Sequence, residues 1–249
     1  ENADGLACAK GAARAACVEV CPAEARTLVG RTVSAGDVMD EVDRDRAFYD
    51  QSGGGVTFTG GEPLAQPRFL RALLEECRRY EVHSAVDTSG IADAGVVAAT
   101  ADLVDLWLFD VKVVDPHKHM MLVGCSNQPA LENLRSLARL GSRIWARVPL
   151  IPGINDGPDD LRSLAGLLKS LAGGQPEQVD LLPYHLSGID KYAKLGREYA
   201  LEGVPQPDAE YVESVASQLR NMGLEVRTSG GGRVIVNERP CQQAAPREP

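Results

Sequence analysis

Two glycines and an acid form the strongest chemical signal in the sequence. They close the segment 56–63 (VTFTGGEP), in which a strand pattern runs into Gly60, Gly61 and Glu62 and then into a proline. Glycine allows a ligand to approach the backbone closely, and the proline can start a helix. With an acidic acceptor beside an open strand end, such a site would suit an ammonium group. The alternative is a plain turn between a strand and a helix, which the complete eight-residue string disfavours.

Carboxylates and a lysine close the next two strand patterns. Asp87 ends the strand 82–87, and Asp110 and Lys112 lie at the end of the segment 106–112 (LWLFDVK). Because side chains alternate along a strand, Asp110 and Lys112 share one face, and the bulky residues between them share the other. Buried charges are costly unless they are paired or used. A binding site therefore competes with two alternatives, a helix cap at Asp87 and an exposed ion pair of Asp110 and Lys112.

Two further strand patterns end in basic or ionisable side chains. Arg147 lies near the end of the strand 143–149, and His185 follows the strand 178–182. In parallel barrels the carboxyl ends of the strands meet at one rim, where sites are built. Five neighbouring strands thus each bring a polar group to the same rim, which predicts a site for a polar small molecule.

The N-terminal cysteines suggest a degraded cluster motif. Cys17 and Cys21, followed by a proline, match the close of a bacterial ferredoxin run. A complete run would need cysteines where Gly11 and Arg14 stand, and Cys8 is out of that register. Two interpretations stay open: an auxiliary iron–sulfur cluster at Cys8, Cys17 and Cys21, or an insert that binds none. The same broken register makes a dedicated electron-transfer module a poor alternative.

Strand and helix patterns alternate between these polar positions, which predicts a parallel sheet flanked by helices. Ser34 is the expected N-cap of the first helix, Phe48 belongs to its apolar stripe, and Cys77 is expected to be a buried thiol. Periodicity does not separate an open doubly wound sheet from a barrel. The expected order is helix 34–48, strand 56–59, helix 67–80, strand 82–87, helix 92–100, strand 104–111, helices 116–122 and 129–140, strand 143–149, helix 158–171, strand 178–182, helix 208–222 and strand 224–228.

Composition limits the partners. The chain of 249 residues has a net charge of −9, and its pI of about 5.0 argues against nucleic acid or an anionic membrane surface as its partner. It holds no apolar run near the roughly 20 residues of a membrane span, and its first residues carry no signal-peptide pattern. Because an initiator Met is lacking, the sequence is interpreted as starting within a longer protein.

Taken together, these residues resemble the glycyl radical enzyme activating enzymes, the pyruvate formate-lyase activating enzyme family of the radical S-adenosylmethionine (SAM) superfamily. The resemblance implies an α/β fold: a partial (β/α)6 barrel of the TIM type, missing its first strand. Its parts would be a remnant ferredoxin-like insert over 1–28, the barrel over 29–228 and a loose tail over 229–249. The motifs that carry it are 49–63 (YDQSGGGVTFTGGEP), VDTSG, FDVK, the loop 124–127, VPLIPGIND, LLPYH and 191–203 (KYAKLGREYALEG).

The resemblance also implies cofactors and their ligands. SAM would bind to a 4Fe–4S cluster held by a C-x3-C-x2-C motif. That motif is absent here, since Glu24 stands in the third position after Cys17 and Cys21, so it is expected upstream of Glu1. Asp87 and Asp110 would hold a monovalent cation. The residues expected to contact SAM are Gly60, Gly61, Glu62, Asp87, Asp110, Val111, Lys112, Arg147 and His185.

The implied activity is the reductive cleavage of SAM, followed by removal of a hydrogen atom from a glycine of a partner enzyme. The partners would be a glycyl radical enzyme and an electron donor such as flavodoxin or ferredoxin, and the chain is expected to be a monomer. His119, Gly124 and Asn127 resemble a signature that seats the partner's glycyl loop, although a surface histidine would also explain His119. Which glycyl radical enzyme is activated stays open. The alternative function is a non-catalytic relative that binds SAM or the partner without a cluster.

Overall fold

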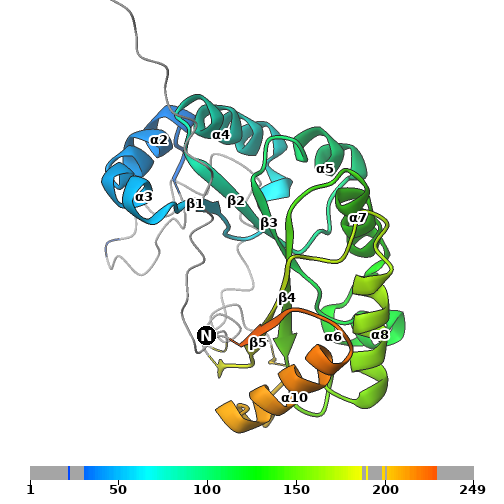
Figure 1. The fold of residues 1–249 in the computed structure, drawn as a ribbon. Coiled ribbons are helices and arrows are strands. Elements are labelled where there is room, and N and C mark those ends of the chain that lie inside the picture. Colours follow the sequence, from blue (N-terminus) through cyan, green and yellow to red (C-terminus); the bar gives the residue numbers. More distant parts are fainter. Residues whose placement is uncertain (1–21, 23–30, 187–188, 190–197, 200, 229–249) are drawn as a thin grey trace, which may run out of the picture.

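A single parallel sheet organises the molecule (Figure 1). The computed structural model describes residues 22, 31–186, 189, 198–199 and 201–228. Its six strands lie in the order of the sequence, and every neighbouring pair is parallel. The strands are β1 (Gly55–Phe58), β2 (His83–Thr88), β3 (Leu106–Asp110), β4 (Ile144–Leu150), β5 (Gln178–Pro183) and β6 (Val226–Thr228).

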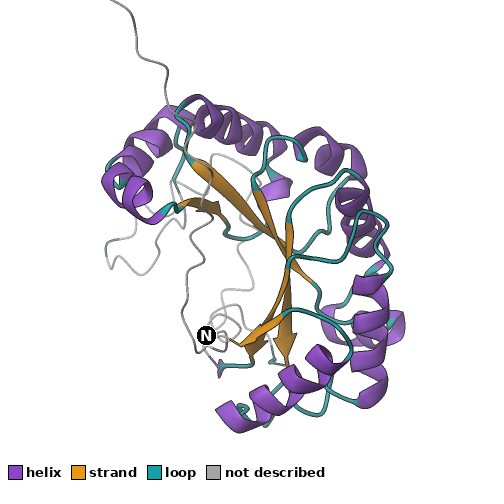
Figure 2. Cartoon of the chain, viewed as in Figure 1, coloured by secondary structure: helices purple, strands orange, loops and turns teal. Residues whose placement is uncertain are grey.

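The sequential strand order makes the sheet one side of a barrel. Each connection moves one strand further in the same direction, and crossovers between parallel strands are right-handed, so the connecting helices collect on one face. Figure 2 shows the helices along the outer side of a curved sheet. A doubly wound sheet would instead reverse its strand order. The predicted partial barrel is therefore confirmed.

The helices follow the predicted order, with one difference at the start. The helix predicted over 34–48 is two helices in the structure, and Phe48 is 67% exposed instead of joining an apolar stripe. Ser34 does form the predicted N-cap, in a capping box with Asp37. The helices are α2 (Ala35–Asp43), α3 (Arg46–Ser52), η1 (Pro63–Ala65), α4 (Pro67–Arg79), α5 (Ala94–Thr100), α6 (Pro116–Val123), α7 (Gln128–Arg139), α8 (Pro158–Lys169) and α10 (Ala209–Asn221).

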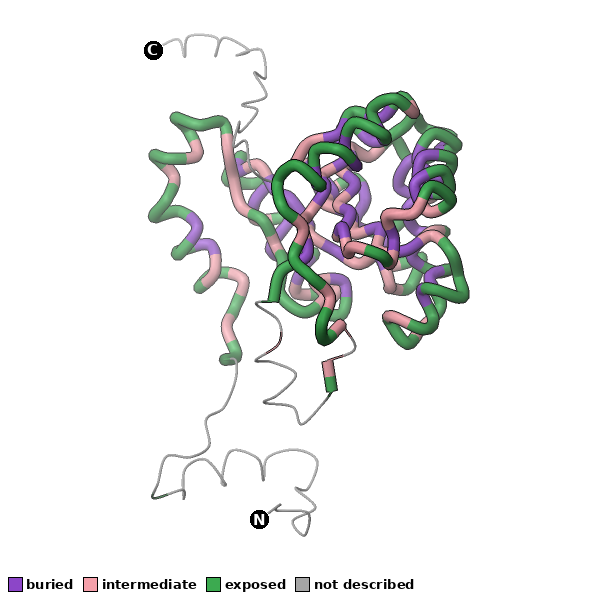
Figure 3. The backbone as a smooth tube through the Cα atoms, turned by 90° about the horizontal axis from the view of Figure 1, so that it is seen from below, coloured by how far each residue is buried: buried purple, intermediate pink, exposed green. Residues whose placement is uncertain are grey.

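The predicted two faces of β3 are confirmed. Trp107, Phe109 and Val111 are at most 3% exposed and belong to the main core between the sheet and the helices. Leu108 and Asp110, on the opposite face, are only half-buried. Figure 3 shows the buried residues gathered inside the molecule and exposed residues along the outer turns of the helices. The concave face of the sheet thus keeps its polar groups accessible, while the convex face supplies the hydrophobic core.

A second, smaller apolar cluster joins α2 to α4. It contains Cys77, which is buried as predicted, with Met39, Val42 and Val82. Burial raises the pKa of the Cys77 thiol to about 11, so this thiol stays protonated at neutral pH. Among the described helices, none combines the length and the apolar composition that crossing a membrane would require.

Candidate functional site

Glu62 joins the ends of the first two strands. Its carboxylate accepts hydrogen bonds from Thr88 Oγ1 at 2.7 Å, from the Ser89 amide at 3.0 Å and hydroxyl at 2.7 Å, and from the Leu64 amide at 3.2 Å. Four bonds use most of what a carboxylate can accept. In this structure Glu62 therefore holds the β2 loop in place, and its predicted contact with an ammonium group stays a prediction. Thr88 and Ser89 belong to the site too, although sequence reasoning did not single them out.

The glycine pair leaves the backbone open beside Glu62. Gly60 has φ +135°, a conformation that other residues rarely adopt, and both Gly60 and Gly61 are exposed. A Cβ added at either position would meet no described atom within 4 Å. The backbone at the end of β1 is therefore accessible to a ligand, as the sequence predicts. Such open space next to exposed peptide groups fits the amino-acid end of SAM.

Charges of alternating sign cross the concave face of the sheet. The strand register pairs Asp110 of β3 with Arg147 of β4, Arg147 with Asp180 of β5, and Asp180 with Arg227 of β6. Register partners in a parallel sheet project from the same face. Sequence reasoning missed Asp180 and Arg227. The sequence signal that could have found Asp180 is its place between the apolar Val179 and Leu181, because side chains alternate along a strand.

Asp87 and Arg147 form an ion pair within this rim. Arg147 NH1 lies 2.5 Å from Asp87 Oδ2, which also accepts a hydrogen bond from Thr59 Oγ1 at 3.2 Å. Both charged side chains are about one quarter exposed. The guanidinium thus supplies positive charge where Asp87 and Asp110 were predicted to hold a monovalent cation. Among the described residues, no cluster of three or more His, Cys, Asp or Glu side chains is placed to bind a metal, and the predicted cation stays a prediction.

Additional positive charge would stabilise the ionised form of two carboxylates at this rim, Asp110 and Asp180. Burial raises the pKa of Asp110, and the neighbouring Asp87 adds to this rise, whereas Arg147 and Lys112 oppose it. Burial also raises the pKa of Asp180, against the hydrogen bond from Gln178. A cationic ligand would favour the ionised form of both carboxylates. The donor chemistry of this rim therefore fits SAM, which carries a sulfonium and an ammonium group.

The remaining predicted SAM contacts lie at the same rim but differ in exposure. His185 is exposed just after β5, and Lys112 is half-buried just after β3. Val111 turns its side chain into the core, at 3% exposure, and its amide donates to the Arg147 carbonyl at 2.8 Å. Val111 can therefore present only its backbone to a ligand.

The residues predicted to bind the partner lie at the loop that follows α6, and two of them are buried. His119 is 4% exposed, and its Nδ1 lies 2.8 Å from the Cys125 carbonyl oxygen, so the alternative of a surface histidine is wrong. Asn127 is also buried, and Gly124 ends α6 with φ +81°. The outer side of this helix carries Met121, which is 84% exposed. The predicted N-terminal cluster ligands Cys8, Cys17 and Cys21 lie outside the described residues.

Comparison with known proteins agrees with this geometry. The sequence model of the Radical SAM superfamily matches residues 19–165. The choline trimethylamine-lyase activating enzyme of Oleidesulfovibrio alaskensis is 39% identical over 82% of this chain and 66% of its own length. The pyruvate formate-lyase 1-activating enzyme of Escherichia coli K12 is 35% identical over 79% of this chain and 80% of its own length.

A solved structure has the same arrangement of strands and helices. A domain of the pyruvate-formate lyase-activating enzyme from Bacteroides vulgatus superposes with a TM-score of 0.60 at 32% identity. The match covers 72% of this chain and 99% of that domain. The chain spans about two thirds of the length of the Oleidesulfovibrio relative, so that relative contains residues with no counterpart here.

Proposed function

This chain belongs to the radical SAM superfamily, within it to the glycyl radical enzyme activating enzymes, and on that premise we propose that it forms the SAM-binding barrel of such an activase. The observation that carries the proposal is the rim itself, where an open glycine backbone lies next to carboxylates that a cationic ligand would stabilise. The similarity to activating enzymes at 35–39% identity supports the same reading.

Each group of the rim has a place in this proposal. Gly60 and Gly61 offer backbone to the methionine part of SAM, and Glu62 keeps the neighbouring loop rigid through Thr88 and Ser89. Asp110 and Lys112 present opposite charges to the ligand from the end of β3. When bound, SAM and a 4Fe–4S cluster together supply a one-electron cleavage that allows hydrogen to be taken from a glycine of the partner. The barrel's part is to orient SAM and to exclude competing reactions.

The partner, the reductant and the cluster ligands are part of the same proposal. The partner is a glycyl radical enzyme, the electron donor is a flavodoxin or ferredoxin, and the cluster is held by cysteines of a C-x3-C-x2-C motif. An oxygen-sensitive cluster implies an anaerobic cytoplasm. An auxiliary cluster at Cys8, Cys17 and Cys21 would extend the electron path.

Gly61→Ala tests the SAM site directly. Because a Cβ at Gly61 meets no described atom within 4 Å, the free protein should fold normally with the extra methyl group. The methyl group would occupy the space that we assign to SAM, so SAM affinity should fall about tenfold or more. Gly166→Ala, which also meets no described atom, is the matched control on α8 and should bind SAM normally. Calorimetry on the cluster-loaded parent protein measures both, and unchanged affinity of Gly61→Ala would contradict the proposal.

A second measurement separates the activase from a non-catalytic relative. The anaerobic parent protein is mixed with SAM, dithionite and a candidate glycyl radical enzyme. An activase forms 5′-deoxyadenosine, and the partner shows a glycyl radical signal in electron paramagnetic resonance. SAM binding with neither product would favour the cluster-free relative.

A further inference from the structure

Three buried asparagines hold the loops at the rim of the sheet. Asn127, Asn133 and Asn155 are each at most 9% exposed, and each donates its side-chain amide to two backbone carbonyls. These carbonyls lie just after β2, just after β3 and at the end of β4. The acceptors are Gly90 and Ala92 for Asn133, Val113 and Val114 for Asn127, and Lys112 and Pro149 for Asn155.

Asn155 differs from the other two because it joins two strand ends. Its Nδ2 donates to the Lys112 carbonyl at 3.1 Å and to the Pro149 carbonyl at 2.6 Å, and its Oδ1 accepts from the Ile151 amide at 2.9 Å. Lys112 follows β3, whereas Pro149 and Ile151 lie at the end of β4. The amide therefore uses both of its donor hydrogens and its acceptor on backbone groups of two strand ends.

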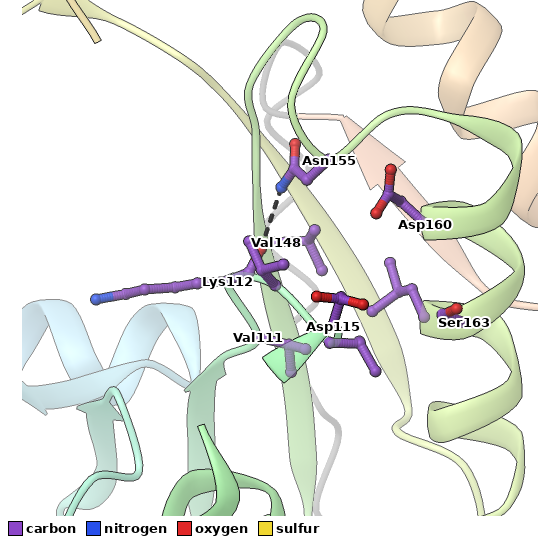
Figure 4. Close-up of a pocket in the computed structure, with 10 residues that line it drawn as sticks. Val111, Lys112, Asp115, Val148, Asn155, Asp160 and Ser163 are labelled. Carbon is purple, nitrogen blue, oxygen red and sulfur yellow. Dashed lines mark hydrogen bonds between the residues drawn. The ribbon is translucent and has the colours of Figure 1, made fainter. Parts of the chain in front are cut away.

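The contact with Lys112 is made to its backbone carbonyl, and its side chain points in another direction. Figure 4 shows the Asn155 amide bonded to the backbone of Lys112, while the Lys112 side chain extends away from Asn155 and from the cavity. This cavity has a volume of about 20 Å3, room for about one water molecule, and Asp115, Asp160 and Ser163 line it. Little space is available for the backbone to rearrange on that side.

Resting on the proposed function, we propose that Asn155 is a positioning residue for SAM binding, which fixes the backbone of Lys112 so that Asp110 and Lys112 face the ligand. The position uses two donors and one acceptor of a single side chain, a set that only the amides of Asn and Gln carry, and Gln is longer by one methylene. Leucine would leave three buried backbone groups unpaired, which is costly. Aspartate would keep the acceptor but would set its oxygen against two carbonyl oxygens.

Two outer contacts hold the loop that carries Asn155. Lys118 of α6 bonds both oxygens of Asp160 at 2.7 Å and the Ile154 carbonyl at 3.4 Å. Tyr211 of α10 donates a short hydrogen bond to Asp156. The loop between β4 and α8 is therefore anchored from two helices, so loss of the Asn155 amide should affect the end of β3 instead of detaching the loop.

Hydrogen exchange of the SAM-free parent protein tests the clamp itself. In Asn155→Ala, peptides that cover 111–115 and 150–156 should exchange about tenfold faster, because the Ile151 amide loses its acceptor and Lys112 its donor. Asn221→Ala, an exposed asparagine at the end of α10, is the matched control and should exchange as the wild type does. Unchanged exchange in both peptides would overturn the proposal.

SAM affinity of the cluster-loaded parent protein tests the positioning role. Asn155→Ala should bind SAM about tenfold or more weakly at a temperature where variant and wild type are both fully folded, although its unpaired backbone groups lower its melting temperature. Asn155→Asp should bind weakly at pH 8 and recover toward the wild type at pH 6, because protonation restores a donor and the two carbonyls favour the neutral acid. A merely structural role would show as a loss of folded protein, whereas the positioning role shows as weaker SAM binding by protein that is fully folded.

The outcomes separate this inference from the proposed function. A wild-type protein that binds no SAM defeats the proposed function. Wild-type affinity in both Asn155 variants, with normal SAM binding by the wild type, overturns the positioning role alone.

Discussion

Asp110 lies half-buried on the concave face of β3, next to Arg147 in the strand register. Its raised pKa shows that the folded protein disfavours the ionised carboxylate when no ligand is present. Binding sites commonly keep such groups at the expense of stability. At the scale of single residues, we therefore expect the free protein to become more stable when Asp110 is replaced by an uncharged side chain of the same shape.

Asp110→Asn should stabilise the free protein. A folded pKa above the unfolded one costs stability at pH values above the ordinary aspartate pKa of about 3.9. The gain in melting temperature should therefore be full at pH 7 and should disappear as the pH falls below about 4. Thermal unfolding at several pH values measures it, and SAM binding by the same variant should be weaker. A lower melting temperature at pH 7 would contradict the assigned penalty.

Gly90→Ala should destabilise the protein strongly. Gly90 has φ +70°, and a Cβ there would lie 2.0 Å from Phe109 Cζ in the core. We expect a loss of about 2–4 kcal/mol in the free energy of unfolding. Gly141→Ala is the matched control, since Gly141 has φ +74° but no described atom within 4 Å of its Cβ. It should cost about 1 kcal/mol, and equal losses in urea titrations would show that the clash is relieved by movement of Phe109.

At the scale of elements, the strands meet through charges and the loops through buried polar side chains. Arg147 of β4 lies in register with Asp110 and Asp180 and pairs with Asp87. The Arg147 guanidinium thus provides positive charge near carboxylates of three other strands, β2, β3 and β5. The loop after α6 is held in a different way, by the contact between the His119 ring and the Cys125 carbonyl.

Arg147→Met, in the middle of β4, should destabilise the sheet more than Arg143→Met, just before the same strand. Loss of Arg147 leaves partly buried carboxylates without their counter-charge, at a cost of about 1–3 kcal/mol. Arg143 pairs with Glu177 in a more exposed ion pair, and its loss should cost less than about 1 kcal/mol. Denaturant unfolding compares the two variants. The loss in Arg147→Met should shrink toward pH 4, as the carboxylates become protonated.

His119→Leu should impair partner activation and leave SAM binding intact. The change removes the contact that holds the Cys125 carbonyl and should shift the loop 124–127 that we assign to the partner. Glycyl radical formation should fall roughly tenfold, while the SAM affinity stays at the wild-type value. His117→Leu, an exposed histidine on the same helix, is the control and should activate normally. Full activation by His119→Leu would separate this loop from partner recognition.

At the scale of the whole molecule, one ligand would join the ends of five strands that are far apart in the sequence. The site spans the rim from Gly60 to His185, and its strands are connected by the backbone ladders of neighbouring strands and by side-chain bonds such as the Arg147–Asp87 pair. A ligand that binds only the folded form raises the free energy of unfolding through mass action. The barrel should therefore respond to SAM as a unit.

SAM should raise the thermal stability of the cluster-loaded parent protein. At 100 times its dissociation constant, SAM should add about 2.7 kcal/mol to the free energy of unfolding. Adenosine at the same concentration is the control and should add much less, because it lacks the charged groups that match the rim. Equal shifts with SAM and adenosine in differential scanning calorimetry would assign the binding to the nucleoside alone.

The sequence by itself determined the alternation of strands and helices, the glycine pair and the two faces of β3. These features depend on neighbouring residues, since side-chain alternation and glycine conformation are local properties. The helical pattern wrongly predicted that Phe48 joins an apolar stripe. In the structure this residue is exposed on a separate short helix.

Tertiary structure alone decided which polar groups meet. The partial barrel, the pairing of Arg147 with Asp87, the bonds of Glu62 and the burial of His119 all join residues from different elements. Strand register determines these contacts, and register depends on the packing of whole β–α–β units. A sequence shows that a charge reaches the rim, but the register selects its partner.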